Sequence, residues 1–201
     1  MSAASAVAAI VLAAGRGTRF GESPKLLAPF GGKPLVRHAV EAALGAELPT
    51  LVVLGHREAE IRAALADLPV IFVANPDYAD GLSTSLKAGF AALPAASAAA
   101  IILLGDMPGV TPALLDRLVG AWEDAGRPSA VVPVAGGRRG NPVLLSRRLS
   151  ADIAHLVGDA GAGPLLKQRP DVVELSADDP AVLFDVDTPA ALASQAAHSQ
   201  S

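Results

Sequence analysis

The sequence predicts an α/β protein in which a mainly parallel sheet is covered by helices on both faces, as a three-layer sandwich. The first observation is that short aliphatic segments alternate with helical patterns along the chain. The second is that each aliphatic segment is apolar throughout, as expected of strands buried on both faces of a parallel sheet. The length of 201 residues fits one sizeable domain, so we expect a single domain over residues 1–201.

The first half of the chain contains four of the predicted strands, at residues 7–12, 51–54, 70–73 and 101–104. Helices are predicted between them at residues 34–45, 57–68 and 83–93. The first helix has Pro34 at its start and Gly45 at its end, which are the positions that these two residues favour. The other two helices are predicted from the spacing of their apolar residues.

The second half continues the alternation and then becomes less regular. Thr111 and Pro112 supply the N-cap and the first turn of a helix that reaches Trp122. A fifth strand is predicted at residues 130–134. The remaining apolar segments lie at 143–145, 172–175 and 183–187, with helical segments between them and a final helix after the last.

The composition of the chain excludes several classes of function. A net charge of −4 and few aromatic residues argue against a nucleic-acid binder. Cysteine is absent, which rules out disulfides, thiolate metal sites and cysteine nucleophiles. No apolar run approaches the roughly 20 residues of a membrane-spanning helix, so we expect a soluble, cytoplasmic protein without membrane contact. The first 40 residues nevertheless hold five basic side chains and one acidic side chain.

A glycine-rich segment follows the first predicted strand, at residues 14–21. Its three glycines let the backbone approach an anion, so that N–H groups can donate to phosphate oxygens. Arg16, Arg19 and Lys25 can neutralise several negative charges at once. The spacing fits neither the dinucleotide-binding glycine pattern nor the lysine-containing phosphate loop. An ordinary glycine turn with solvated basic residues is the alternative, but three cations after a buried strand favour a polyphosphate site.

Carboxylates follow two of the later apolar segments. Asp106 comes directly after the strand at 101–104, where it could hold a divalent metal bound to phosphates. Asp185 and Asp187 are two residues apart, so in a strand both carboxylates would lie on one face. Together these groups could bind one or two Mg²⁺ ions. Each aspartate has a structural alternative, because aspartates also cap turns and helices, and Pro189 suits the first turn of the last helix.

Residues 75–86 place three hydroxyl side chains around a predicted helix start. This loop could read the edge of a nucleobase, and a serine N-cap beside a surface turn explains it equally well. The four histidines show no metal-ligand spacing, and we assign none of them a catalytic role. Arg138 and Arg139 precede a Gly-Asn-Pro turn and suit either an anionic acceptor or a solvated hairpin.

The run from Leu12 to Gly21, together with Lys25, resembles the nucleotide-binding opening of the MobA-like nucleotidyltransferases, particularly of the molybdenum cofactor cytidylyltransferase branch. The resemblance covers about residues 7–192, and the combination of motifs in this order is specific for the superfamily. Asn141 stands where the branch usually has histidine, and Gly163 lies where a basic residue is common. Further matching segments lie at 75–86, 105–108, 139–143, 158–162 and 185–189.

The resemblance implies a Rossmann-like nucleotidyltransferase fold with a nucleotide-binding half at about 1–110 and an acceptor-binding half at about 111–195. It implies Mg²⁺-dependent transfer of a nucleoside monophosphate onto a phosphorylated acceptor, molybdopterin, with release of pyrophosphate. Lys25, Arg19 and Asp106 would be catalytic, and Asp106 with Asp187 would bind the metal. The nucleotide-binding residues would be Leu12, Ala13, Ala14, Gly15, Arg16, Gly17, Arg19, Lys25, Asn75, Gly81, Ser83 and Ser85.

The Ala-Ala-Gly sequence in the opening motif resembles the cytidylyl branch, which favours CTP over GTP. Three alternatives stay open: a sugar-1-phosphate or another phosphorylated metabolite as the acceptor, GTP as the nucleotide, and a nucleotide-binding regulatory module without turnover. Lys25 and the aspartates at two strand ends speak against the regulatory module, since binding alone needs fewer such groups. A molybdoenzyme or its chaperone would be the protein partner that receives the product.

Overall fold

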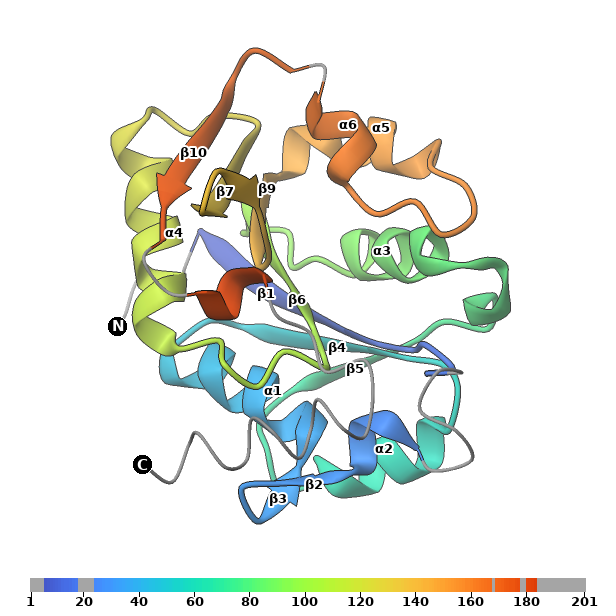
Figure 1. Ribbon diagram of the computed structural model, residues 1–201. Coiled ribbons are helices and arrows are strands. Elements are labelled where there is room, and N and C mark those ends of the chain that lie inside the picture. Colours follow the sequence, from blue (N-terminus) through green and yellow to red (C-terminus); the bar gives the residue numbers. More distant parts are fainter. Residues whose placement is uncertain (1–5, 18–23, 168, 178–179, 184–201) are drawn as a thin grey trace.

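The structure is a computed structural model that describes residues 6–17, 24–167, 169–177 and 180–183 (Figure 1). The strands of its main sheet are β1 (Val7–Ala13), β4 (Thr50–Leu54), β5 (Ile71–Ala74), β6 (Ala99–Leu104), β7 (Ala130–Ala135), β8 (Arg138–Arg139), β9 (Val143–Ser146) and β10 (Val172–Ser176). They are ordered β10-β7-β9-β6-β1-β4-β5, with β8 beside β7. A small antiparallel pair consists of β2 (Pro29–Phe30) and β3 (Lys33–Pro34).

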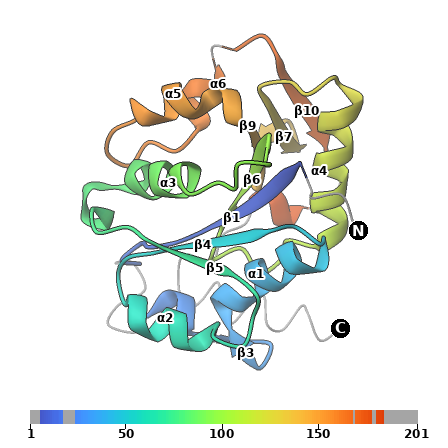
Figure 2. The ribbon, with the colours of Figure 1, turned by 180° about the vertical axis from the view of Figure 1, so that it is seen from behind.

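Helices cover both faces of this sheet, as the sequence predicts. The α-helices are α1 (Leu35–Gly45), α2 (Glu58–Ala64), α3 (Leu82–Ala91), α4 (Pro112–Asp124), α5 (Ser150–Ala154) and α6 (Gly163–Lys167). Short 3₁₀-helices are η2 (Lys25–Leu27), η3 (Tyr78–Asp80), η4 (Arg147–Leu149) and η5 (Pro180–Leu183). Helices α1, α2 and α4 lie on one face, and α3, α5 and α6 lie on the other (Figures 1 and 2). Within the described residues, no helix is both long and apolar enough to span a membrane.

The centre of the sheet is parallel, which confirms the predicted fold class. In β1, Ile10 is aligned with Leu51 of β4 on one side and with Ile102 of β6 on the other, and both pairings are parallel. Strands β8 and β9 are the exceptions, because β8 runs antiparallel to β7 and β9 runs antiparallel to both β6 and β7. The chain passes from β7 to β9 through the short β8 hairpin, whereas a parallel connection needs a crossover of about a dozen residues or more.

The two faces of β1 belong to different core clusters. Val11 packs in the cluster that includes Val40 of α1, and Ile10 packs in the cluster that includes Leu86 of α3. A Cβ atom added at Gly89 of α3 would lie only 2.6 Å from Cγ2 of Ile10, so α3 lies very close to the strand. Small residues in the helices therefore set the close spacing of the layers.

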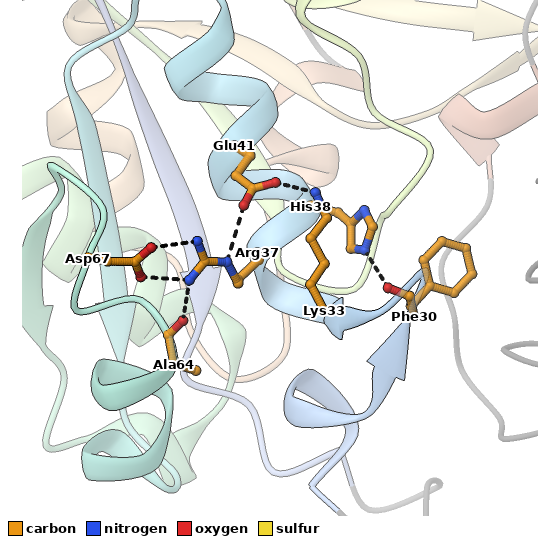
Figure 3. Close-up of polar contacts among 7 residues, drawn as sticks. All are labelled: Phe30, Lys33, Arg37, His38, Glu41, Ala64 and Asp67. Atoms are coloured by element: carbon orange, nitrogen blue, oxygen red, sulfur yellow. Dashed lines mark hydrogen bonds and ion pairs between the residues drawn. The ribbon is translucent and has the colours of Figure 1, made fainter.

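One predicted helix end is wrong, since α2 stops at Ala64 and residues 65–68 continue as turns. The guanidinium group of Arg37 in α1 donates to the carbonyl oxygen of Ala64 at 2.9 Å, which satisfies a terminal acceptor of the helix (Figure 3). Arg37 also donates to both carboxylate oxygens of Asp67, at 2.7 and 2.9 Å. The end of α2 is thus held by a side chain from α1.

These contacts belong to a cluster that we call the α1 charge cluster, formed by Lys33, Arg37, Glu41 and Asp67 (Figure 3). Hydrogen bonds from Arg37 hold the pKa of Asp67 at about 2. Burial raises the pKa of Glu41, but hydrogen bonds from Lys33 and Arg37 outweigh this effect and lower it. Beside the cluster, His38 donates from Nε2 to the carbonyl oxygen of Phe30 at 2.9 Å, and burial lowers the pKa of His38.

Candidate active site

A cavity of about 520 Å³ opens beyond the carboxyl ends of β1, β4 and β6. In open α/β sheets this edge is where ligands bind. The loop after β1 contributes Gly15 to Gly17, the turn after β4 contributes His56 and Arg57, and Asp106 follows β6. Lys25 from η2, Tyr78 from η3, Ser85 from α3 and Asp159 from the loop before α6 also belong to its polar lining. The fold therefore assembles the site from segments far apart in the sequence.

An ion pair lies inside this cavity, between residues that the sequence analysis assigns to catalysis. The Nζ atom of Lys25 donates to Oδ2 of Asp106 at 2.6 Å, with the two side chains 9% and 19% exposed. The turn that holds Asp106 is tied to the end of β1, because the N–H group of Gly105 donates to the carbonyl oxygen of Leu12 at 3.0 Å. A carboxylate at the end of β6 is thus paired with a cation from η2.

The start of the glycine loop leaves space at the cavity. A Cβ atom at Gly15 would have no heavy atom within 4 Å, so an anion can approach the backbone there. Gly17 has a φ of +59°, and an added Cβ atom would lie 3.1 Å from Cβ of Lys25. The loop is therefore folded directly onto the lysine. Arg19 lies outside the described residues, so its predicted place near the triphosphate stays a prediction.

An aromatic side chain that the sequence analysis did not assign to the site also lines the cavity. Tyr78 packs against Gly55, where an added Cβ atom would lie 2.6 Å from Cβ of Tyr78. The guanidinium carbon of Arg16 lies 5.7 Å from the centre of the Tyr78 ring, and the ring of His56 lies 6.1 Å from it. His56 and Arg57 follow β4 directly, so the rule that sites gather after strand ends could have identified them.

The loop expected to read a nucleobase is largely bonded to itself. The amide nitrogen of Asn75 donates to the hydroxyls of Thr84 at 2.9 Å and Ser85 at 3.0 Å, while its oxygen accepts from the N–H group of Asp77. Asn75 is only 4% exposed. Ser83 is buried, and its hydroxyl has no partner among the described residues. These internal bonds fix the shape of the loop that leads into α3.

The two halves of the chain meet at the rim of the cavity. Gly81 has a φ of +111°, and an added Cβ atom would lie 2.3 Å from the carbonyl carbon of Gly158. The N–H group of Ser83 donates to the carbonyl oxygen of Gly158 at 3.0 Å. This close contact requires glycine at position 81 and brings Asp159 to the cavity.

Nine of the predicted site residues line the cavity, namely Leu12, Ala14, Gly15, Arg16, Gly17, Lys25, Gly81, Ser85 and Asp106. Ala13, Asn75 and Ser83 are buried beside it and are not part of its lining. Asp185 and Asp187 lie outside the described residues. Arg139 pairs with Glu174 at 2.8 Å, with both side chains exposed, and does not line the cavity.

The acidic groups of the cavity suit a metal that arrives with a nucleotide. Asp106 and Asp159 are the carboxylates of its described lining, and the described residues contain no group of three or more His, Asp or Glu side chains that could hold a metal ion by themselves. Mg²⁺ is commonly bound through one or two carboxylates together with substrate phosphates and water. The donor set therefore fits a divalent cation shared with a bound triphosphate.

The parallel sheet, the open glycine loop and the lysine–aspartate pair in the cavity define a nucleotide-binding α/β protein of the nucleotidyltransferase type. The chain belongs to the family described as MobA-like NTP transferase domain, whose model matches residues 9–173. This confirms the resemblance to the MobA-like nucleotidyltransferases.

Similar proteins include both enzymes and a solved structure. The chain is 33% identical over 189 residues to a nicotine blue oxidoreductase of Paenarthrobacter nicotinovorans, covering 90% of this chain and 92% of that protein. It is 43% identical over 129 residues to a bifunctional protein GlmU of Kineococcus radiotolerans, covering 62% of this chain and about a quarter (26%) of that protein's length. The crystal structure of Rv0371c from Mycobacterium tuberculosis H37Rv matches with a TM-score of 0.82 at 28% identity, covering 96% and 97% of the two chains. The same protein has also been solved in complex with manganese.

Proposed function

We propose that this protein transfers CMP from CTP to a phosphorylated acceptor, with molybdopterin as the acceptor and pyrophosphate as the released product. The observation that carries the proposal is the pairing of Lys25 with Asp106 at 2.6 Å inside a cavity that also holds the open glycine loop. A lysine and an arginine beside exposed backbone N–H groups suit a triphosphate. The reaction would take place in the cytoplasm.

In this reaction a phosphate oxygen of the acceptor attacks the α-phosphorus of the nucleotide, and the bond to the β-phosphate breaks. The new phosphorus–oxygen bond forms in line with the departing pyrophosphate, so positioning and charge neutralisation provide most of the catalysis. Lys25 would neutralise the α-phosphate, Arg16 and Arg19 the other phosphates, and Asp106 with Asp187 would hold the Mg²⁺ ion. When bound, this ion supplies positive charge to the phosphate oxygens.

The choice of CTP rests on the Ala-Ala-Gly sequence at residues 13–15, and the choice of acceptor rests on resemblance. We assign Asn75 the role of shaping the loop at residues 75–86. Its amide nitrogen donates to Thr84 and Ser85, and its amide oxygen accepts from the N–H group of Asp77. We therefore expect Ser85 and Gly81, which line the cavity, to be the closer neighbours of the nucleotide. A molybdoenzyme or its chaperone would receive the product.

The first test is the thermal stability of the protein with each Mg²⁺–nucleoside triphosphate, without any acceptor. A ligand present at about 100 times its Kd adds about 2.7 kcal/mol to the free energy of unfolding. Preferential stabilisation by CTP supports the proposal, and release of pyrophosphate on adding molybdopterin would establish the reaction. Preference for GTP would redirect the assignment to guanylyl transfer, and no response to any nucleotide would contradict the phosphate site.

A second candidate function is redox chemistry, because the relative from Paenarthrobacter nicotinovorans matches nearly the whole chain and is called an oxidoreductase. A dinucleotide cofactor carries a pyrophosphate, and the glycine loop would have to bind it without the spacing of the dinucleotide-binding glycine pattern. The test is oxidation of NADPH or NADH by the purified protein with a quinone-like dye as the acceptor. Oxidation of the cofactor together with no pyrophosphate release would favour this function over nucleotidyl transfer.

A further inference from the structure

The cavity contains a flat aromatic surface that none of the proposed phosphate or metal contacts uses. Tyr78 is the only tyrosine of the chain, and its side chain is half-buried at the turn before α3. Among the described residues that line the cavity, Tyr78 and His56 supply the aromatic rings. The polar groups of the neighbouring loop are meanwhile engaged with one another, as the bonds of Asn75 show.

The position of Tyr78 is set by Gly55, which directly follows β4. An added Cβ atom at Gly55 would lie 2.6 Å from Cβ and 2.7 Å from Cγ of Tyr78, so a larger residue would displace the ring. The same atom would lie 2.9 Å from Cβ of Ala14, which places Tyr78 over the ends of both β1 and β4. The ring is therefore held directly beside the start of the phosphate-binding loop.

The surroundings of the ring connect it to that loop. The guanidinium carbon of Arg16 lies 5.7 Å from the ring centre, within the range of a cation–π contact. The ring of His56 lies 6.1 Å away with an interplanar angle of 47°. Arg16 of the glycine loop thus contacts the Tyr78 ring. A ligand bound at this loop would therefore lie close to the ring.

We propose that Tyr78 is the surface on which the base of the bound nucleotide stacks, with Arg16 linking this surface to the triphosphate. The proposal rests on the function proposed above. Aromatic rings stack on any nucleobase, so Tyr78 would add affinity for nucleotides without selecting between CTP and GTP. Specificity for the base would then come from the hydrogen-bonding groups around Gly81 and Ser85.

The test compares two Mg²⁺-bound ligands, CTP and inorganic tripolyphosphate, because they share the phosphates and differ in the nucleoside. Dissociation constants are measured by calorimetry for the wild type, Tyr78→Leu and Tyr78→Phe. We expect Tyr78→Leu to bind CTP at least about fivefold more weakly, as loss of stacking on one base predicts, and to bind tripolyphosphate as the wild type does. Tyr78→Phe keeps the ring and should bind both ligands normally.

Phe72→Leu is a matched control, because Phe72 of β5 also carries an arginine over its ring, with the guanidinium carbon of Arg62 at 4.5 Å, but does not line the cavity. It should leave both dissociation constants unchanged. Unaltered CTP binding by Tyr78→Leu would overturn the inference while the proposed function stands, and so would an equal loss of both ligands. Failure of the wild type to bind either ligand would overturn the proposed function itself.

Discussion

Two ion pairs in this protein join residues far apart in the sequence, Arg37 with Asp67 in the α1 charge cluster and Lys25 with Asp106 in the cavity, and they differ in their surroundings. In the α1 charge cluster, Arg37 contacts Glu41, Asp67 and the carbonyl oxygen of Ala64, and the Asp67 side chain is 66% exposed. In the cavity, Lys25 and Asp106 are 9% and 19% exposed. The cluster contacts the last residue of α2 through Arg37, whereas the pair in the cavity lies beside the glycine loop.

The comparison shows that the location of an ion pair is more informative about function than its geometry. Both groups contain good hydrogen bonds, and the bonds of Arg37 to Asp67 are the more extensive ones. Exposed pairs contribute little to stability, so the cluster mainly holds one helix end in place. The cavity pair places a buried cation and a carboxylate beside the glycine loop.

The largest effect is expected for Asp106→Asn. Loss of this carboxylate should lower the rate of pyrophosphate release by about 10²-fold or more, since electrostatic contacts of this kind contribute that much to catalysis. Thermal unfolding monitored by circular dichroism should show that the variant still folds. Asp67→Asn is the matched control, because it removes an aspartate from the other ion-pair group and should keep full activity. Equal rates of pyrophosphate release by Asp106→Asn and Asp67→Asn would show that Asp106 has no role in the reaction.

A second large effect is expected for Gly81→Ala, at the contact between the two halves of the chain. The new Cβ atom would lie 2.3 Å from the carbonyl carbon of Gly158, and the φ of +111° is unfavourable for alanine. We expect the free energy of unfolding in urea to fall by about 1–3 kcal/mol. Gly120→Ala in α4 is the control, because nothing lies within 4 Å of its added Cβ atom and alanine should stabilise the helix. Similar free energies of unfolding for Gly81→Ala and Gly120→Ala would mean that the contact between Gly81 and Gly158 is not tight.

A smaller, pH-dependent effect is expected for His38. Burial lowers its pKa in the folded protein, so between this value and the ordinary value of about 6.5 the unfolded chain binds more protons. Stability should therefore be greatest above pH 6.5 and should decrease as the pH falls through the folded pKa. His38→Gln keeps a donor for Phe30 and should flatten this part of the stability curve. An unchanged slope between pH 7 and 5 in the variant would assign the dependence to another group.

The smallest effect is expected for Asp67 at acidic pH. Its pKa of about 2 in the folded protein lies below the value of about 3.9 for the unfolded chain. The contribution of Asp67 to stability is therefore complete above pH 4 and is lost as the pH falls towards 2. Asp67→Asn lacks this contribution at pH 7, so the variant should be slightly less stable than the wild type there and should lose less stability between pH 4 and pH 2 in urea unfolding curves. A wild-type decrease that persists in the variant would exclude Asp67 as its origin.

Much of the site could be predicted from the sequence because its parts follow predicted strands. Gly15, Lys25 and Asp106 belong to local sequence patterns that can be recognised without knowing any tertiary contact. Tyr78 could not be assigned in the same way, since its place at the cavity depends on how η3 packs against Gly55 and Ala14 at the ends of β4 and β1. Asn75 is the opposite case, because the sequence analysis assigns it to nucleotide binding, whereas in the structure its side chain donates to Thr84 and Ser85 of its own loop.

The sequence by itself determined the α/β class, the order of most strands and helices, and the glycine loop, because apolar runs and glycine positions act over short stretches of chain. Only the tertiary structure decided the antiparallel place of β9, the early end of α2 at Ala64 and the meeting of Gly81 with Gly158. Each of these depends on a partner distant in the sequence, such as the guanidinium group of Arg37. Local patterns predict which elements form, and the packing between distant elements decides where they end and which side chains they bring together.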